Sequence, residues 1–174
     1  MKNRKETDML KKIISGGQTG ADQGGLFAGK EAGLETGGYA PKGFKTEDGC
    51  SSWLADEFGL VESWSPDYHV RTYQNAWASD GTIRIAKNFE TRGEICTLKA
   101  IDLHKKPYID IQFYDPNGAI ESETVQEVVD WIKRNRIEVL NVAGNRESTC
   151  VGIQAFVEKF LMGVIERLKN ENQE

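Results

Sequence analysis

Short apolar segments typical of β-strands alternate along the chain with longer segments typical of α-helices. The expected strands are residues 11–15, 36–40, 81–86, 107–111 and 138–142. The helical segments have apolar residues three and four positions apart, and the clearest stripe runs from Ile153 to Leu168. This alternation predicts βαβ units, which build an α/β fold with a mostly parallel sheet covered by helices on both faces.

Length and charge limit the domain count and the class of partner. We expect one domain over residues 1–174, with flexible ends at about 1–10 and 169–174. The net charge of −5 argues against nucleic acid as a partner, because such binding usually needs a basic face. No apolar run is long enough to span a membrane, and the polar N-terminus lacks the apolar core of a signal peptide. We therefore expect a cytoplasmic protein.

Neither a metal site nor a disulfide is expected. The three cysteines are far apart, and the chain has only two histidines and no CxxC or HxxxH spacing. An odd number of cysteines in an intracellular chain indicates reduced thiols. No Ser-His-Asp or Cys-His spacing stands out, so we assign no catalytic residue.

The first candidate site is the glycine-rich loop after the first expected strand, with the sequence SGGQTGAD. Ligands of parallel sheets bind outside the carboxyl ends of the strands, and a helix is expected to follow this loop over residues 21–33. The unpaired amides at the start of a helix favour an anion. No GK[ST] follows, so the loop is not a P-loop, and Ser15 stands where a dinucleotide-binding motif has its first glycine. The alternative is a tight turn in which Thr19 and Asp22 cap the helix.

Two further loops leave expected strands and carry polar side chains. After residues 138–142 come Gly144, Arg146, Glu147 and Ser148, of which the arginine suits a phosphate. The alternative for this loop is helix capping with a surface ion pair.

After residues 81–86 come Thr91, Arg92, Gly93 and Glu94. Arg92 and the Gly93 amide would face an anion there. The alternative is that Thr91 caps the next helix and Glu94 adds a favourable charge to its first turn.

The weaker candidates lie outside these loops. Asp80 lies before a strand, where Asp-Gly more often forms a turn. Like Asp22, Glu94 and Glu147, it could supply a general acid or base. Lys42 could reach a phosphate or remain in solvent. Residues 41–65 are irregular and rich in aromatic residues, and they form either an ordered flap over a site or a surface excursion packed on its own aromatics.

Together these motifs resemble the molybdenum carrier family, which is similar to molybdenum cofactor carrier proteins. That family belongs to the circularly permuted YpsA-type branch of the SLOG/lysine-decarboxylase-like superfamily. The resemblance rests on ISGGQTGAD, GGYAPKG, EDG, RTYQNAWASDGT, KPY and WIKRNRIEVLNVAGNRES, in the family's order. It implies a three-layer α/β/α Rossmann-like fold, commonly oligomeric, and a phosphate-bearing ligand that is nucleotide-like or pterin-like. The family's name suggests molybdenum cofactor, held for storage or transfer.

The resemblance also implies which residues bind the ligand. The matching ligand-binding positions are Gly16, Gly17, Gln18, Thr19, Gly20, Asp22, Lys42, Asp80, Gly144, Arg146, Glu147 and Ser148. The chain departs from the family at Asn145, where a proline is common. It also reads Thr91-Arg92-Gly93-Glu94 where a TGGT-like turn is expected, which changes the size and charge of that wall.

The leading hypothesis is therefore a non-enzymatic carrier of molybdenum cofactor. It would form a homo-oligomer, either a dimer or a tetramer, and molybdoenzymes would be the recipients. The alternatives are a phosphoribohydrolase acting on nucleoside monophosphates and a sensor of a nucleotide-derived signal. The hydrolases of the superfamily share a PGGxGTxxE signature that this chain lacks, although Arg92 and Glu94 lie in a comparable turn.

Overall fold

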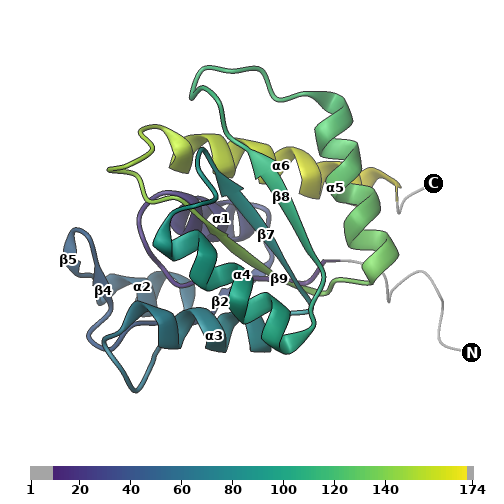
Figure 1. Cartoon of the computed structure of the whole chain (residues 1–174). Coiled ribbons are helices and arrows are strands. Elements are labelled where there is room, and N and C mark those ends of the chain that lie inside the picture. Colours follow the sequence, from purple (N-terminus) through teal and green to yellow (C-terminus); the bar gives the residue numbers. More distant parts are fainter. Residues whose placement is uncertain (1–9, 172–174) are drawn as a thin grey trace, which may run out of the picture.

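A five-stranded sheet forms the centre of the protein (Figure 1), seen in a computed structural model that describes residues 10–171. The strands lie in the order β2 (Glu35–Gly37), β1 (Lys12–Ile14), β9 (Val139–Gly144), β7 (Gly81–Ala86) and β8 (Tyr108–Gln112). All neighbouring pairs are parallel. The predicted parallel sheet is confirmed.

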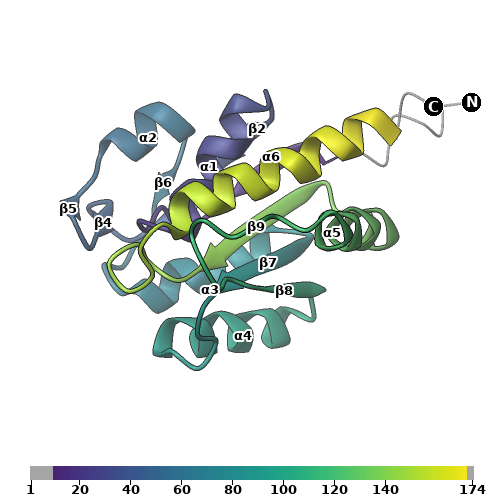
Figure 2. The same ribbon diagram turned by 90° about the horizontal axis from the view of Figure 1, so that it is seen from above.

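Helices cover both faces of the sheet, as predicted. Figure 2 shows α1 (Ala21–Glu31) and α6 (Ile153–Glu171) above the sheet, with α3 (Tyr68–Ala78) and α4 (Arg92–His104) below it. The remaining long helix, α5 (Ser122–Asn135), packs against α6. The main core lies between the sheet and the α1, α5 and α6 layer. Among the described residues, no helix is both long enough and apolar enough to cross a membrane.

The order of the strands brings three loops together. From β1 the chain moves outward to β2, and from β7 it moves outward in the other direction to β8. β9 then returns between β1 and β7, so the loops after β1, β7 and β9 leave the same edge side by side. Such a reversal of strand order is where open α/β sheets bind ligands.

The expected strand at residues 36–40 is divided in two. Gly38 has a φ of 116°, and a Cβ on it would lie 2.2 Å from the Ser15 carbonyl oxygen. The chain therefore bends after β2 and continues as β3 (Tyr39–Ala40), which pairs with β6 (Val61–Glu62). The Asn75 side chain binds both the N–H and the carbonyl of Tyr39, at 2.8 and 2.9 Å.

Residues 41–65 combine the two structures considered for them. Helix α2 (Trp53–Phe58) packs Leu54 and Phe58 against Leu26 of α1 in a small second core. The strands β4 (Lys45–Thr46) and β5 (Gly49–Cys50) instead form a short hairpin that reaches the loops at the carboxyl edge of the sheet. Most of the segment is thus packed, and only the hairpin approaches the candidate site.

Two differences concern helices. Helix α3 was not expected, because its segment is rich in polar residues and places Trp77 on the surface. Helix α6 continues to Glu171, whose side chain accepts hydrogen bonds from Lys133 and Gln126 of α5, so residues 169–171 are helical. Residues 1–9 and 172–174, also expected to be flexible, lie outside the described residues.

Candidate ligand site

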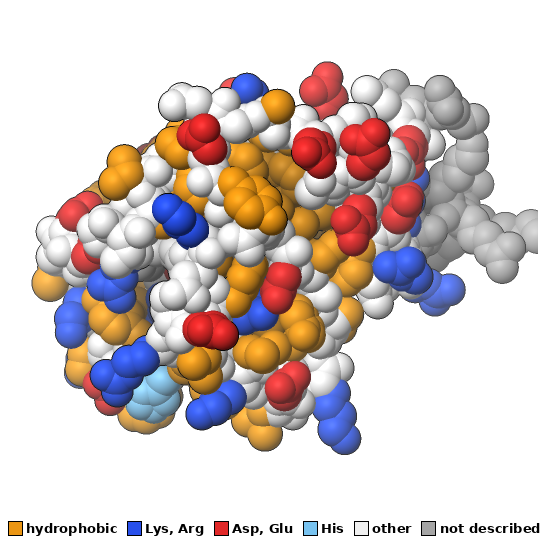
Figure 3. All heavy atoms as spheres, turned by 45° about the horizontal axis from the view of Figure 1, so that its top comes forward, with side chains coloured by type: hydrophobic (Ala, Val, Ile, Leu, Met, Phe, Trp, Pro, Cys, Tyr) orange, Lys and Arg blue, Asp and Glu red, His pale blue; other side chains and the backbone are white. Residues whose placement is uncertain are grey.

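A cavity of about 700 Å³ opens where the loops after β1, β7 and β9 meet the first turns of α3 and α4. It is lined by Gln18, Asp22, Asp67, Tyr68, His69, Arg71, Thr72, Thr91, Arg92, Gly93, Glu94, Cys96, Thr97, Ala143, Gly144, Asn145, Arg146 and Thr149. On the face drawn in Figure 3, Lys and Arg side chains lie at both ends of the molecule, and Asp and Glu side chains are most frequent toward α5. The position agrees with the expectation that a ligand would bind outside the carboxyl ends of the strands.

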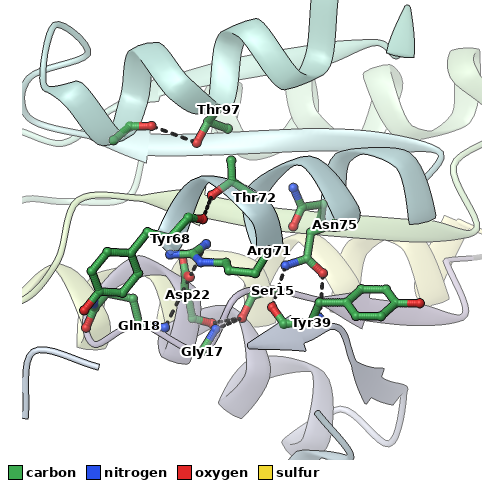
Figure 4. Close-up of polar contacts among 12 residues, drawn as sticks. Ser15, Gly17, Gln18, Asp22, Tyr39, Tyr68, Arg71, Thr72, Asn75 and Thr97 are labelled. Atoms are coloured by element: carbon green, nitrogen blue, oxygen red, sulfur yellow. Dashed lines mark hydrogen bonds and ion pairs between the residues drawn. The ribbon is translucent and has the colours of Figure 1, made fainter. Parts of the chain in front are cut away.

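The amides of the glycine-rich loop are already bound within the protein. Gln18 N donates to Asp22 Oδ2 at 3.2 Å, and Gly17 N donates to Ser15 Oγ at 3.2 Å (Figure 4). Thr19 N donates to Gln18 Oε1 at 3.0 Å, and Gly20 N donates to a side-chain oxygen of Gln154. The carboxylate of Asp22 therefore lies where an anionic ligand was expected, and the loop supplies its own anion.

The glycines of this loop make room for neighbouring groups. A Cβ on Gly16 would lie 2.0 Å from Arg71 Nη1, and one on Gly17 would lie 2.7 Å from a methyl group of Leu60. Gly20, the residue before α1, has a φ of 83°, and its Cβ would lie 2.5 Å from the Asn145 carbonyl oxygen. Neither Thr19 nor Asp22 caps α1 through a side chain. The loop is rich in glycine because its backbone packs closely against neighbouring groups and leaves no room for a side chain at these positions.

Arg71 of α3 lies over the glycine-rich loop and points toward Asp22 (Figure 4). Its Nη1 is 3.4 Å from Asp22 Oδ2, and both side chains are largely buried. Burial raises the pKa of Asp22, while Arg71 and the amides of Gln18 and Gly16 partly oppose this shift. Arg71 was not among the predicted residues, because only the fold brings α3 to this loop.

Glu94 forms a second buried carboxyl group on the opposite wall, in the first turn of α4. Burial raises its pKa to about 7; Arg84 opposes the shift, and Asp22 and Asp110 add to it. Arg84 lies 3.9 Å from the Glu94 carboxyl group, but its hydrogen bonds go to both oxygens of Asp110 and to the Glu94 carbonyl. The Glu94 carboxyl group is therefore poised to change charge near neutral pH.

Three buried polar atoms around the cavity have no hydrogen-bond partner among the described residues. They are the donors Gln18 Nε2 and Arg71 Nε and the acceptor Glu94 Oε2. Buried polar atoms are normally paired, so these three atoms carry hydrogen-bonding capacity that the described residues do not satisfy. All three residues line the same cavity, which makes it the candidate ligand site.

The loop after β9 closes one side of the cavity. A Cβ on Gly144 would lie 1.9 Å from the Ile85 carbonyl oxygen, so the loop can approach β7 only with glycine here. Asn145 Oδ1 accepts hydrogen bonds from the amides of Lys87 and Asn88, at 3.0 and 3.3 Å. Asn145, which stands where the family commonly has proline, thus binds the loop after β7 through its side chain. A proline side chain could not make these hydrogen bonds.

The cavity contains half of the residues predicted from the sequence. Those that line it are Gln18, Asp22, Thr91, Arg92, Gly93, Glu94, Gly144 and Arg146. Thr91 also caps α4, since its side chain accepts a hydrogen bond from Glu94 N at 3.3 Å. The two roles considered for Thr91 are therefore compatible.

The other predicted residues lie outside the cavity lining. Asp80 is at the amino end of β7, the far edge of the sheet, and its Oδ2 accepts hydrogen bonds from Glu138 N and Val139 N. Lys42 is exposed. Glu147 binds the amides of Gly152 and Gln154 at the start of α6. The structure thus separates these three from the site. Gly16, Gly17 and Gly20 shape the loop, and Thr19 and Ser148 hydrogen-bond Glu47.

Sequence reasoning missed the wall that α3 contributes. Tyr68, Arg71 and Thr72 lie three and four positions apart, so they share one face of the helix. Recognising this helix would have placed all three side chains on one surface. Cys96 of α4 also lines the cavity, and burial raises the pKa of its thiol. No group of three or more His, Cys, Asp or Glu side chains within residues 10–171 is arranged to hold a metal ion.

The parallel sheet, its two helical layers and the cavity at the reversal of strand order define a Rossmann-like α/β protein. The chain belongs to the circularly permuted YpsA SLOG family, whose model matches residues 13–165. This confirms the family recognised from the sequence motifs.

Among solved structures, the chain is similar to the "Putative molybdenum carrier protein" from Syntrophus aciditrophicus SB. The two share 29% sequence identity with a TM-score of 0.81. The match covers 92% of this chain and 98% of that chain. No curated protein matches the chain significantly.

Proposed function

We propose that the protein binds a phosphate-bearing small molecule in this cavity, with molybdenum cofactor as the leading candidate, and holds it for storage or transfer without turnover. The observation that carries the proposal is the set of three buried, unpartnered polar atoms on Gln18, Arg71 and Glu94. Each of these atoms belongs to a residue that lines the cavity, so small side-chain movements would present two donors and one acceptor to the polar edge of a ligand. A volume of about 700 Å³ falls within the usual range for small-molecule sites.

The charges of the cavity favour an anionic ligand. Arg71, Arg92 and Arg146 line it together with three acidic residues, Asp22, Asp67 and Glu94. Because the pKa of Glu94 is about 7, protonation of this group leaves the arginines in excess at or below neutral pH. Guanidinium groups bind phosphate oxygens through paired hydrogen bonds. The name of the similar solved protein supports a molybdenum-containing cargo.

Ligand-dependent thermal stabilisation tests this function. Molybdenum cofactor or a pterin phosphate at a hundred times its dissociation constant should add about 2.7 kcal/mol of stability, and so raise Tm by roughly 5–10 °C. Replacing the exposed Arg92 by alanine should weaken the stabilisation, while the control Arg134→Ala, on the surface of α5, should leave it unchanged. A melting curve that none of these ligands moves would refute the proposal.

Glu94 favours a second candidate function, the cleavage of the N-glycosidic bond of a nucleoside monophosphate. A buried carboxyl group with a pKa of about 7 can hold a proton at neutral pH and deliver it to the departing base, while water adds to C1′ of the ribose and releases a proton to the solvent. Base release should then occur with the native protein and stop with Glu94→Gln. If no base is released from any of the common nucleoside monophosphates, the cleavage function is rejected and only the carrier function remains.

The proposed carrier acts in the cytoplasm as a homo-oligomer, a dimer or a tetramer, and passes its cargo to molybdoenzymes. Support for self-association comes from the exposed apolar side chains of Trp77 on α3 and Leu103 on α4, which are 63% exposed each. Native mass spectrometry of the freshly purified protein would report the subunit number and any bound small molecule together.

A further inference from the structure

The tip of the β4–β5 hairpin places a carboxylate among hydrogen-bond donors from two of the site loops. Glu47 accepts hydrogen bonds from the Thr19 hydroxyl and from both the amide and the hydroxyl of Ser148. Arg146 Nη1 lies 3.9 Å from the Glu47 carboxylate. The donors come from the loops after β1 and β9, whereas the carboxylate comes from a separate hairpin.

The donors around Glu47 are suited to a phosphate group. Two hydroxyls, one amide and one guanidinium converge on two carboxylate oxygens, and a phosphate would present more oxygens and more negative charge to them. Burial alone would raise the pKa of Glu47, but the hydrogen bonds from Ser148 and Thr19 and the charge of Arg146 together lower it. The surroundings of Glu47 therefore favour an anion.

We propose that Thr19, Arg146 and Ser148 form an oxyanion subsite that Glu47 occupies in the ligand-free protein, and that a ligand phosphate replaces the Glu47 carboxylate. The proposal deepens the function proposed above and rests on it for the identity of the whole ligand. It assigns the phosphate position to these side chains rather than to the amides of the glycine-rich loop, which already donate to side-chain oxygens of Ser15, Asp22, Gln18 and Gln154.

Hydrogen bonds within the hairpin would allow it to leave the loops as a unit. The Thr46 hydroxyl binds Gly49 O, Ser51 Oγ and Asp48 N, so the turn is held together by its own contacts. Asp48, Gly49 and Cys50 are exposed. Besides Glu47, the tip contacts the site through Lys45, whose Nζ lies 5.3 Å from the centre of the Tyr68 ring. Displacement of the Glu47 carboxylate therefore removes its contacts with Thr19 and Ser148 and leaves the hydrogen bond from the Glu47 amide to Gln18.

Gln18 connects the subsite to the cavity. Its Oε1 accepts hydrogen bonds from the amides of Glu47 and Thr19, while its unpartnered Nε2 lies in the cavity wall. Arg146 belongs to both places, because it faces Glu47 and also lines the cavity. A phosphate in the place of the Glu47 carboxylate would thus leave the remainder of its molecule beside Gln18, in the cavity.

Inorganic phosphate is the probe that tests this subsite. Glu47→Gln keeps the size of the side chain and removes the competing charge, so it should bind phosphate about tenfold more tightly than the native protein, measured by isothermal titration calorimetry. Asp48→Asn is the matched control, since it removes the same charge from the neighbouring exposed position and should leave phosphate affinity unchanged. Equal affinities for the two variants, or weaker binding by Glu47→Gln, would overturn the proposal.

Hydrogen exchange in the native protein gives a second test that needs no variant. Saturating phosphate should speed exchange of the Glu47 amide, because its hydrogen bond to Gln18 opens more often once the carboxylate contacts are lost. Unchanged or slower exchange at saturation would contradict displacement. The tests also separate the two proposals. Pterin phosphate binding that is insensitive to Glu47→Gln would refute the subsite alone, whereas tighter phosphate binding without pterin binding would refute the carrier function alone.

Discussion

The glycine-rich loop after β1 and the wall formed by α3 and α4 face the same cavity, but they differ in how their polar groups are used. In the loop, amides bind the protein's own acceptors, among them the Asp22 carboxylate and Ser15 Oγ. In the wall, Arg71 Nε and Glu94 Oε2 are buried without partners. A segment whose polar groups are satisfied is structural, whereas one with open polar groups is prepared for a ligand. The most distinctive motif of the sequence thus mainly builds the site and contributes Gln18 Nε2 to it, and less distinctive residues supply the other open polar groups.

The comparison predicts that a glycine-to-alanine substitution destabilises the protein strongly in the glycine-rich loop and only slightly in the wall of α3 and α4. Gly20→Ala should destabilise the protein by about 4 kcal/mol, because the residue has a φ of 83° and its Cβ would lie 2.5 Å from the Asn145 carbonyl and 2.6 Å from Glu147 N. Gly93→Ala should change stability by less than about 1 kcal/mol, since a Cβ there meets nothing within 4 Å. Urea unfolding measures both. Similar losses for the two variants would break the comparison.

The open wall also predicts a dependence of stability on pH. The pKa of Glu94 in the folded protein is about 7, against an ordinary value of 4.5, so the folded state binds this proton more tightly than the unfolded state. The resulting stability is fully present below pH 4.5 and is lost as the pH rises through about 7. Glu94→Gln should reduce the loss of stability between about pH 5 and about pH 8 by up to about 3 kcal/mol.

Unfolding in urea at both pH values measures this effect. Any pH-independent destabilisation caused by the glutamine cancels when the free energies of unfolding at the two pH values are subtracted. Glu90→Gln, at an exposed position just before α4, serves as the control and should leave the pH dependence as it is in the native protein. If Glu94→Gln also retains the full pH dependence, Glu94 does not titrate in this range. The proposed difference between the glycine-rich loop and the wall of α3 and α4 would then have no electrostatic evidence.

The sheet was predictable because strand and helix signals are local. All five expected strands correspond to strands of the sheet, β1, β2, β7, β8 and β9, although Gly38 divides the second one. Helix α3 was missed because its segment is polar overall and buries polar side chains such as Asn75 and Thr72, so few of its core-facing positions are apolar. Helix propensity alone did not identify it, and its packing against α4 depends on residues distant in the sequence.

The candidate site was predictable only in part, for a related reason. The rule that ligands bind at the carboxyl ends of strands selected Arg92, Glu94 and Arg146, and all three line the cavity. The sequence could not show that Asp22 and Glu47 would take the positions expected for an anion, because both contacts depend on tertiary packing. Amides near a helix start indicate an anion site only when no side chain of the protein already binds them.

The smallest predicted effect concerns the hydroxyl of Thr91, which caps helix α4 in the wall of the cavity. Thr91→Ala should destabilise the protein by about 1 kcal/mol, because the Thr91 side chain accepts the Glu94 amide at the start of α4. Thr149→Ala removes an exposed hydroxyl that donates only to the Arg146 carbonyl, and it should cost less than about 0.5 kcal/mol. Thermal unfolding of the two variants compares the two losses. An equal cost for both would mean that the first turn of α4 is held by the packing of Glu94, so that the wall, like the glycine-rich loop, is fixed by its tertiary neighbours rather than by its own cap.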